Sequence, residues 1–108
     1  MRLTPTEAEI QQAILQGLAA KRIFAGRLNT GTGFAGGRPV QHHSFGKGTA
    51  DILAFTRCYV LWIECKTEKG IQSQEQKSFA EKVQSEFHHY LIARSWDDVE
   101  EWLRKHGL

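Results

Sequence analysis

Two apolar segments joined by only three residues constrain the fold of this chain more than any other feature. Residues 51–55 (DILAF) and 59–66 (YVLWIECK) are rich in β-branched and aromatic side chains, and residues 56–58 (TRC) connect them. A connection this short is typical of an antiparallel hairpin. The sequence therefore predicts two paired strands over residues 51–66.

The N-terminal segment has the pattern of an amphipathic helix of about 15 residues. Thr4 is the expected N-cap, Pro5 the first helical residue, and Glu7 closes a capping box. If Thr6 is the cap instead, Glu9 closes the box and needs no further role. The residues expected to face the core recur at helical spacing: Ile10, Ala13, Ile14 and Leu18.

Two further helices are predicted in the second half of the chain, each beginning at a serine. Ser73 is the expected N-cap of the first, and Gln76 closes its capping box. Its inward face comprises Gln76, Phe79, Ala80, Val83 and Phe87. Ser95 begins the last helix, whose inward residues are Val99, Trp102 and Leu103. Strands within residues 22–30, 40–45 and 89–93 complete the expected elements.

Glycine dominates the stretch between residues 31 and 48, so no helix is expected there. Residues 31–36 (GTGFAG) match the pattern G-x-G-x-x-G of dinucleotide-binding loops, and Asp51 follows about 20 residues after its start. That fingerprint requires a helix to begin at the last glycine, and residues 37–40 (GRPV) cannot continue as one. We therefore expect a loop that leads into the strand at residues 40–45.

The length and composition indicate one domain. With 108 residues, 41% of them hydrophobic, the chain can form a single modest core over residues 1–108. Its apolar runs are far shorter than the roughly 20 residues that span a bilayer, and the N-terminus has no secretory signal pattern. We expect a cytoplasmic protein with no membrane partner. Cys58 and Cys65 lack the spacing of a zinc site and are expected to be reduced core residues.

The net charge of +2 is unevenly distributed. No acidic residue lies between Glu9 and Asp51, and the basic residues of this stretch are Lys21, Arg22, Arg27, Arg38 and Lys47, together with His42 and His43. A basic half of this kind favours a phosphate-backbone partner. An ordinary solvated surface explains the charge alone equally well.

One face of the predicted hairpin carries chemically active side chains. Strand side chains alternate between faces, so Glu64 and Lys66 point the same way. Pairing across the turn places Asp51 close to residues 63 and 64. Two carboxylates and a lysine would then share one patch, which suits a hard divalent ion and phosphate chemistry. A solvated cluster of ion pairs is an equally good interpretation of the geometry alone.

The order of these residues closely resembles the virus-type replication-repair nuclease (VRR-NUC) family of the PD-(D/E)XK nuclease superfamily. The resemblance rests on Gly48-Thr49-Ala50-Asp51, Glu64-Cys65-Lys66 and Gln76, preceded by helical Glu9, and it extends to Tyr90. Ala50 replaces the proline that names the superfamily, as is common in this family. The resemblance implies an α/β fold with a restriction-endonuclease-like core. This core would be a mixed sheet flanked by helices in the order α-β-β-β-α-β-α.

The resemblance also implies roles for individual residues. Asp51, Glu64 and the backbone carbonyl of Cys65 would hold a catalytic Mg²⁺ or Mn²⁺, and Glu9 would join the metal shell directly or through water. Lys66 would position or activate the attacking water, and Gln76 would orient Lys66 or the scissile phosphate. The expected products carry a 5′-phosphate and a 3′-hydroxyl.

The basic stretch ahead of Asp51 is the candidate clamp for the DNA backbone. The residues assigned to it are Arg38, His42, His43 and Lys47, and Lys69 after the E-x-K motif joins them. His42 and His43 are weaker candidates as metal ligands, because adjacent strand residues face opposite ways.

The function predicted from this resemblance is a structure-selective DNA endonuclease similar to Holliday-junction resolvases. Its expected substrate is branched DNA, a four-way junction or a flap. Two symmetric cuts would come naturally from a C2 homodimer. The isolated domain suggests the cytosol of a bacterium or of a phage-infected cell. Two alternatives stay open: a nucleic-acid-binding module without catalysis, and a restriction-type nuclease that reads a base sequence.

Overall fold

The computed structural model describes residues 4–28, 32–35, 38–41 and 45–108, with residues 32–35 and 38–41 described by their backbone alone. The elements are, in chain order, α1 (Glu7–Ala20), β1 (Phe24–Arg27), β2 (Thr32–Ala35), β3 (Arg38–Gln41), β4 (Ile52–Phe55), β5 (Val60–Cys65), α2 (Gln74–Ser85), β6 (His89–Ala93) and α3 (Trp96–Lys105). Within these residues, no helix has both the length and the apolar character that crossing a membrane requires.

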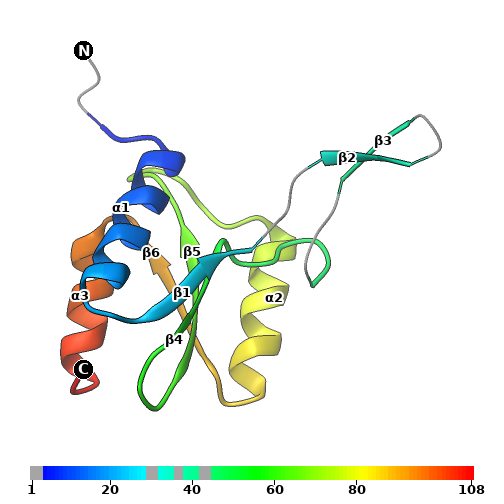
Figure 1. The fold of residues 1–108 in the computed structure, drawn as a ribbon. Helices are drawn as coiled ribbons and strands as arrows, with labels where there is room; N and C mark the ends of the chain where they lie inside the picture. The colour runs from blue at the N-terminus through cyan, green and yellow to red at the C-terminus, as the bar shows by residue number, and fades with distance from the viewer. Residues whose placement is uncertain (1–3, 29–31, 36–37, 42–44) are drawn as a thin grey trace.

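A mixed four-stranded sheet forms the centre of the molecule, with strand order β1-β4-β5-β6 (Figure 1). The predicted hairpin is confirmed: β4 and β5 are antiparallel, and Ile52 pairs with Ile63. β1 continues the sheet antiparallel to β4, whereas β6 runs parallel to β5 after the crossover through α2. The coarse prediction of an α/β fold with a mixed sheet flanked by helices is therefore confirmed.

The predicted order α-β-β-β-α-β-α is wrong in its strand count. Five strands precede α2 in the described part of the chain, because β2 and β3 pair with each other as a separate antiparallel hairpin. The segment Thr32–Ala35 (TGFA) was expected to be a loop, since glycine weakens strands. Pairing with β3 supplies the hydrogen bonds that local propensity does not predict. Residues 42–44 of the predicted strand at 40–45 lie outside the described residues.

The main core lies between the sheet and the helix pair α1 and α3 (Figure 1). α1 contributes Ile10, Ile14 and Leu18 at the predicted helical spacing, whereas Ala13, also expected to face inward, is exposed. Val99 and Leu103 of α3 are fully buried. Cys65 is buried as predicted, but Cys58 is exposed because it lies in the turn between β4 and β5.

The helix starts follow the capping residues closely. The prediction of Thr4 as the first cap is wrong, and the alternative with Thr6 is correct: Thr6 Oγ1 accepts from Glu9 N at 3.2 Å. Thr6 N donates to Glu9 Oε1 at 3.0 Å, which completes the capping box. Ser73 and Ser95 cap α2 and α3 as predicted.

A smaller cluster lies on the opposite face of the sheet, under α2. Ala50, Phe79 and Val83 are buried there against Trp62 and Tyr90. α2 covers only part of this face. Near the edge strand β1, the rings of Phe24 and Phe55 stack with their centroids 5.7 Å apart and remain 78% and 46% exposed.

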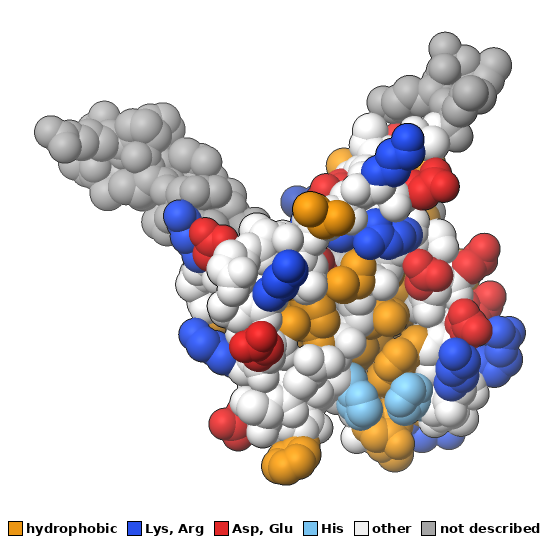
Figure 2. Space-filling model, turned by 180° about the vertical axis from the view of Figure 1, so that it is seen from behind, with side chains coloured by type: hydrophobic (Ala, Val, Ile, Leu, Met, Phe, Trp, Pro, Cys, Tyr) orange, Lys and Arg blue, Asp and Glu red, His pale blue; other side chains and the backbone are white. Residues whose placement is uncertain are grey.

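An aromatic and histidine cluster closes one end of the molecule where β6 meets α3. Tyr59, His89, Trp102 and His106 contact one another, and the rings of Trp102 and His106 stack at 3.9 Å. Figure 2 shows the molecule from behind, where histidines lie at the lower end of a band of hydrophobic side chains. Burial, followed by the charges of His106 and His88, lowers the pKa of His89.

Phe87 does not continue the buried face of α2 as predicted; it lies beyond the helix end and is 94% exposed. Its φ of 64° lies in the left-handed region. The first residue beyond a helix often adopts this conformation, and it is usually glycine. His88 N donates to Val83 O at 3.2 Å, which gives the hydrogen bond of a Schellman motif. The chain thus places a bulky side chain at a position that favours glycine.

We expect Phe87→Gly to raise the free energy of unfolding by roughly 1 kcal/mol, because it relieves the left-handed backbone without removing a buried side chain. Denaturant titration measures this gain. Phe87→Ala is the matched control, since alanine keeps the Cβ atom and should give no comparable gain. An equal stabilisation by both variants would contradict the backbone explanation.

Candidate active site

Asp51 reaches the end of β5 from the adjacent strand. It directly precedes β4, and its backbone N donates to Ile63 O at 3.0 Å, so that the ladder extends by one step. Asp51 Oδ2 accepts a hydrogen bond from Cys65 N at 2.8 Å. The expected proximity of Asp51 to residues 63 and 64 is therefore confirmed, and a backbone donor fixes the carboxylate.

Glu64 and Lys66 lie beside each other at the end of β5. Both are buried, with 2% and 8% of their surface exposed, and Lys66 Nζ lies 4.0 Å from Glu64 Oε2. Lys66 N donates to Ala93 O at 3.0 Å, which joins the segment after β5 to the end of β6. Two ionisable side chains are thus buried in contact with each other, unlike the solvated ion pairs of the alternative interpretation.

Gln76 connects α2 to the same carboxylate. Its Oε1 accepts from Ser73 N at 2.8 Å and closes the capping box, while its Nε2 donates to Glu64 Oε2 at 3.1 Å. The capping explanation is therefore correct, and Gln76 also contacts Glu64, whereas its predicted role toward Lys66 or the scissile phosphate stays a prediction. One amide fixes the helix start and one oxygen of Glu64 together.

The environment of Glu64 favours its neutral form. Burial is the largest cause, followed by the negative charge of Asp51 and a hydrogen bond with its carboxyl group; together they raise the pKa of Glu64 to about 8. Lys66 opposes this shift, and Glu7 adds to it. A hydrogen bond between the two carboxyl groups forms only when one of them is protonated, because two ionised carboxylates have no donor. A proton or a cation between the two groups would relieve their repulsion.

Glu64 Oε1 is the atom best suited to a cation. It is buried and has no hydrogen-bond partner among the described residues, whereas Oε2 contacts both Gln76 and Lys66. Buried carboxylate oxygens are normally hydrogen bonded or bound to metal. Within the described part of the chain, no three His, Cys, Asp or Glu side chains converge as a metal group. The neighbouring carboxyl groups of Asp51 and Glu64 are oxygen ligands of the kind that Mg²⁺ or Mn²⁺ takes, because these ions bind few carboxylates and keep waters.

The acidic residues of α1 divide into two roles. Glu9 is the third helical residue, and its Oε1 accepts from both the N and the Oγ1 of Thr6. Burial and then Asp51 are the main causes that raise the pKa of both Glu64 and Cys65, and the charge of Glu7, which the sequence pattern linked only to capping, adds the smallest contribution. Because the N-cap is Thr6 and not Thr4, Glu9 closes the capping box and Glu7 takes no part in it.

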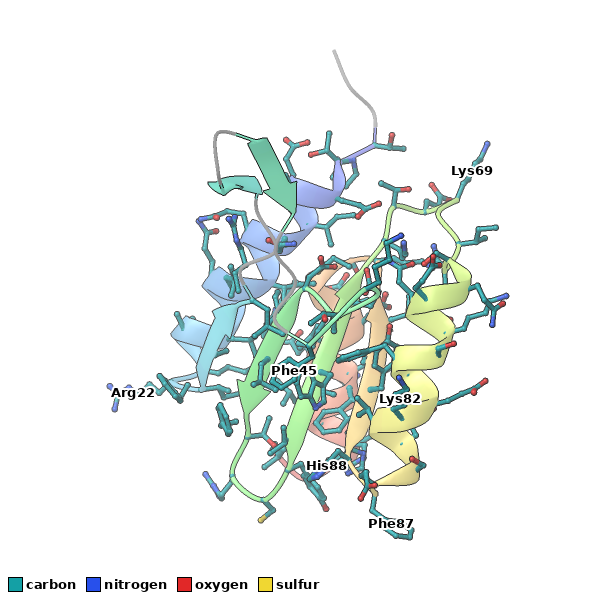
Figure 3. The ribbon with its side chains drawn as sticks, turned by 90° about the vertical axis from the view of Figure 1, so that its right-hand side faces the viewer. Arg22, Phe45, Lys69, Lys82, Phe87 and His88 are labelled. Carbon is teal, nitrogen blue, oxygen red and sulfur yellow. The ribbon has the colours of Figure 1, made fainter. Side chains whose placement is uncertain are left out.

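The predicted DNA-binding residues are only partly described. Lys47 and Lys69 are exposed, and Figure 3 shows Lys69 extending outward from the loop that follows β5. Arg38 begins β3, of which only the backbone is described, and His42 and His43 lie outside the described residues. The clamp over Arg38, His42 and His43 thus stays a prediction.

Arg94 holds the loop that follows the E-x-K motif, a role that the sequence did not indicate. Its Nη1 donates to the carbonyl oxygens of Thr67, Glu68 at 3.1 Å and Gly70 at 2.8 Å. One guanidinium therefore links the segment carrying Lys66 to the end of β6. A lone arginine directly after an apolar strand was the available signal, but its partners are more than 20 residues away.

We expect Arg94→Lys to lower the free energy of unfolding by roughly 2 kcal/mol, since hydrogen bonds from a charged donor each contribute about 1.5–3 kcal/mol and lysine cannot span three carbonyls. Hydrogen exchange of residues 67–70 should accelerate. Arg104→Lys, on the exposed face of α3, is the matched control. Unchanged exchange in the loop would contradict this role for Arg94.

Gly48 allows α2 to approach the site. Its φ is +85°, and a Cβ atom there would collide with the backbone of Glu75, one residue before Gln76. Thr49 Oγ1 supports the same turn by donating to Gly46 O at 2.6 Å and accepting from Phe45 N at 3.2 Å. The resemblance included Gly48 in the motif but gave it no physical role. The close contact with α2 explains why glycine is needed at this position.

Comparisons with models of protein families and with curated proteins found no match to this chain.

Proposed function

We propose that this protein is a metal-dependent endonuclease of the PD-(D/E)XK type, similar to the VRR-NUC family, which hydrolyses phosphodiester bonds in DNA. The observation that carries the proposal is the buried Glu64 carboxyl beside Asp51, with one oxygen unpartnered among the described residues and the other contacted by Lys66 and Gln76. A purely structural ion pair between Glu64 and Lys66 would not need the carboxylate of Asp51, which is partly buried, next to it.

The reaction would use the residues as follows. Asp51, Glu64 and the Cys65 carbonyl would hold a divalent ion, which would neutralise charge at the phosphate and lower the pKa of the attacking water. Lys66 Nζ donates hydrogen bonds that orient the attacking water and stabilise negative charge on the phosphate. Gln76 keeps Glu64 Oε2 in place. Water oxygen bonds to phosphorus and the bond to the 3′ oxygen breaks, which gives a 5′-phosphate and a 3′-hydroxyl.

The resemblance to the VRR-NUC family supports a substrate class as well. We propose that the protein recognises DNA by its shape, with a four-way junction or flap as substrate. A C2 homodimer would place two sites for paired cuts. By the same resemblance, we assign the activity to the cytoplasm of a bacterium or of a phage-infected cell.

Cleavage of a labelled four-way junction and a matched linear duplex tests this function. Wild type and Lys66→Ala are compared with Mg²⁺ and with Mn²⁺, and DNA binding is measured in parallel by gel shift. We expect the wild type to cut the junction and Lys66→Ala to bind without cutting. Retained cleavage in Lys66→Ala would refute the catalytic assignment. Junction binding by the wild type without cleavage in either metal would favour a binding module instead.

A further inference from the structure

A groove of about 540 Å³ lies between α2 and the partly uncovered face of the sheet. Three aromatic residues line it: Phe45, Trp62 and Phe79. The Phe45 and Trp62 rings meet edge to face at 5.2 Å, and Trp62 and Phe79 do the same at 5.2 Å. Phe45 is 62% exposed, so much of its ring is available to a further ring. We call this site the aromatic groove.

The aromatic groove adjoins the candidate active site through neighbouring residues of β5 and α2. Trp62 and Glu64 lie two residues apart on β5 and therefore on the same face of the sheet. Gln74 and Glu75 line the groove, and the next residue of α2 is Gln76, which holds Glu64. A polymer chain that leaves the site along α2 would enter this groove.

Positive side chains come from both walls of the aromatic groove. Lys47 belongs to the segment before β4 and Lys82 to α2, and His88 lines the far end (Figure 3). Glu75 and Glu86 also line it. Phosphates would pair with the lysines at the rims, and the carboxylates can accept hydrogen bonds from the amino groups of bases. The chemistry of the lining thus combines stacking surfaces, cations for a backbone and acceptors for base edges.

We propose that the aromatic groove binds an unstacked nucleobase of single-stranded DNA adjoining the scissile phosphate, an inference that rests on the proposed nuclease function. Aromatic rings flanked by lysines bind single strands through base stacking and phosphate contacts. The bases of a perfect duplex are stacked on their neighbours, whereas a flap or a branch point offers unpaired bases at little cost. The groove would therefore favour branched DNA without reading its sequence.

The alternative occupant is a second copy of the chain, whose exposed Phe87 could insert into an apolar groove. Two observations favour DNA. Lys47 and Lys82 line the groove from two different segments, which suits a polyanion, and the groove adjoins the residues proposed to cut DNA. An apolar side chain from a second copy would use neither feature.

Phe45→Ala tests the proposal, because Phe45 is largely exposed and its removal should leave the fold intact. Binding of a labelled 5′ flap, a four-way junction and a linear duplex is measured by fluorescence anisotropy in EDTA. We expect flap affinity to fall about 5- to 150-fold, given the roughly 1–3 kcal/mol that stacking contributes per base, while duplex affinity changes less than about twofold. Phe24→Ala, an exposed ring on β1 outside the groove, is the matched control and should change neither.

A 2-aminopurine base in the unpaired arm reports stacking directly. Its fluorescence should be quenched by wild type and much less by Phe45→Ala. Equal losses for flap and duplex, or no loss, would overturn the proposal, as would a change in self-association alone, seen by sedimentation. The two proposals fail separately: cleavage by wild type with unchanged binding by Phe45→Ala would refute only the groove. Selective binding without cleavage in any divalent metal would refute only the nuclease.

Discussion

Glu64→Gln is expected to unfold at a higher denaturant concentration than the wild type at pH 8 without metal, and to lose cleavage by at least about 10³-fold. Glutamine preserves the shape of the side chain but carries no charge, so it ends the repulsion with Asp51. It also removes the carboxylate that we propose as a metal ligand. One substitution should therefore raise stability and abolish activity, as expected where function maintains an unfavourable charge.

The pH dependence follows from the raised pKa of Glu64. Its pKa is about 8 in the folded protein and 4.5 when the side chain is fully solvated, so the folded state holds a proton that the unfolded state has released. This contribution to stability is fully present below about pH 4.5 and is lost as the pH rises through about 8. We expect metal-free wild type to lose several kcal/mol across this range through Glu64, and Glu64→Gln to lose much less.

Denaturant titrations at pH 5, 7 and 9 in EDTA measure this difference between the two proteins. Glu101→Gln, on the exposed surface of α3, is the matched control and should follow the wild type. Equal pH dependence of wild type and Glu64→Gln would mean that Glu64 is not a buried carboxyl of raised pKa. If Glu64→Gln cleaved DNA at the wild-type rate, Glu64 would not be an active-site residue.

Gly48→Ala is expected to lower the free energy of unfolding by roughly 2–5 kcal/mol. A left-handed backbone costs a residue with a Cβ atom about 1–2 kcal/mol, and displacing packed groups costs about 1–3 kcal/mol. The displaced group is the backbone of Glu75, at the start of α2. Because Gln76 follows directly, its hydrogen bond to Glu64 should lengthen and cleavage should fall together with stability.

Gly46→Ala is the matched control for this effect. Gly46 also has a left-handed backbone, with φ of +91°, but among the described residues no atom beyond its two chain neighbours lies within 4 Å of a Cβ placed there. Gly46→Ala should therefore show only the conformational cost of about 1–2 kcal/mol and retain cleavage. Thermal unfolding and junction cleavage of the two variants separate the contributions. Equal losses in both would refute the contact between Gly48 and α2.

Local patterns predicted the part of the fold that positions the site. The β4–β5 hairpin has a short turn and strongly apolar strands, so pairing alone brings Asp51 next to Glu64. Ser73 and Gln76 are three residues apart, and the capping box they predict is present. Each of these features depends on neighbouring residues in the sequence, or on strands joined by a tight turn, which is why one sequence was sufficient.

Other features depend on distant contacts that no local pattern contains. The three carbonyl groups bound by Arg94 and the helix backbone beside Gly48 are set by tertiary packing. The choice between Thr4 and Thr6 as N-cap lay between two good local signals, and the structure selects the second. That shift of two residues is also the reason why the charge of Glu7 near the site was missed.

The most direct test of the metal site is a calorimetric titration of wild type and Glu64→Gln with Mn²⁺ at pH 7. We predict one ion per wild-type chain, with proton release because Glu64 must ionise to bind it. The heat should then vary with the ionisation enthalpy of the buffer, and Glu64→Gln should bind no ion at this site. Equal Mn²⁺ binding by the two proteins would contradict a metal site at Asp51 and Glu64.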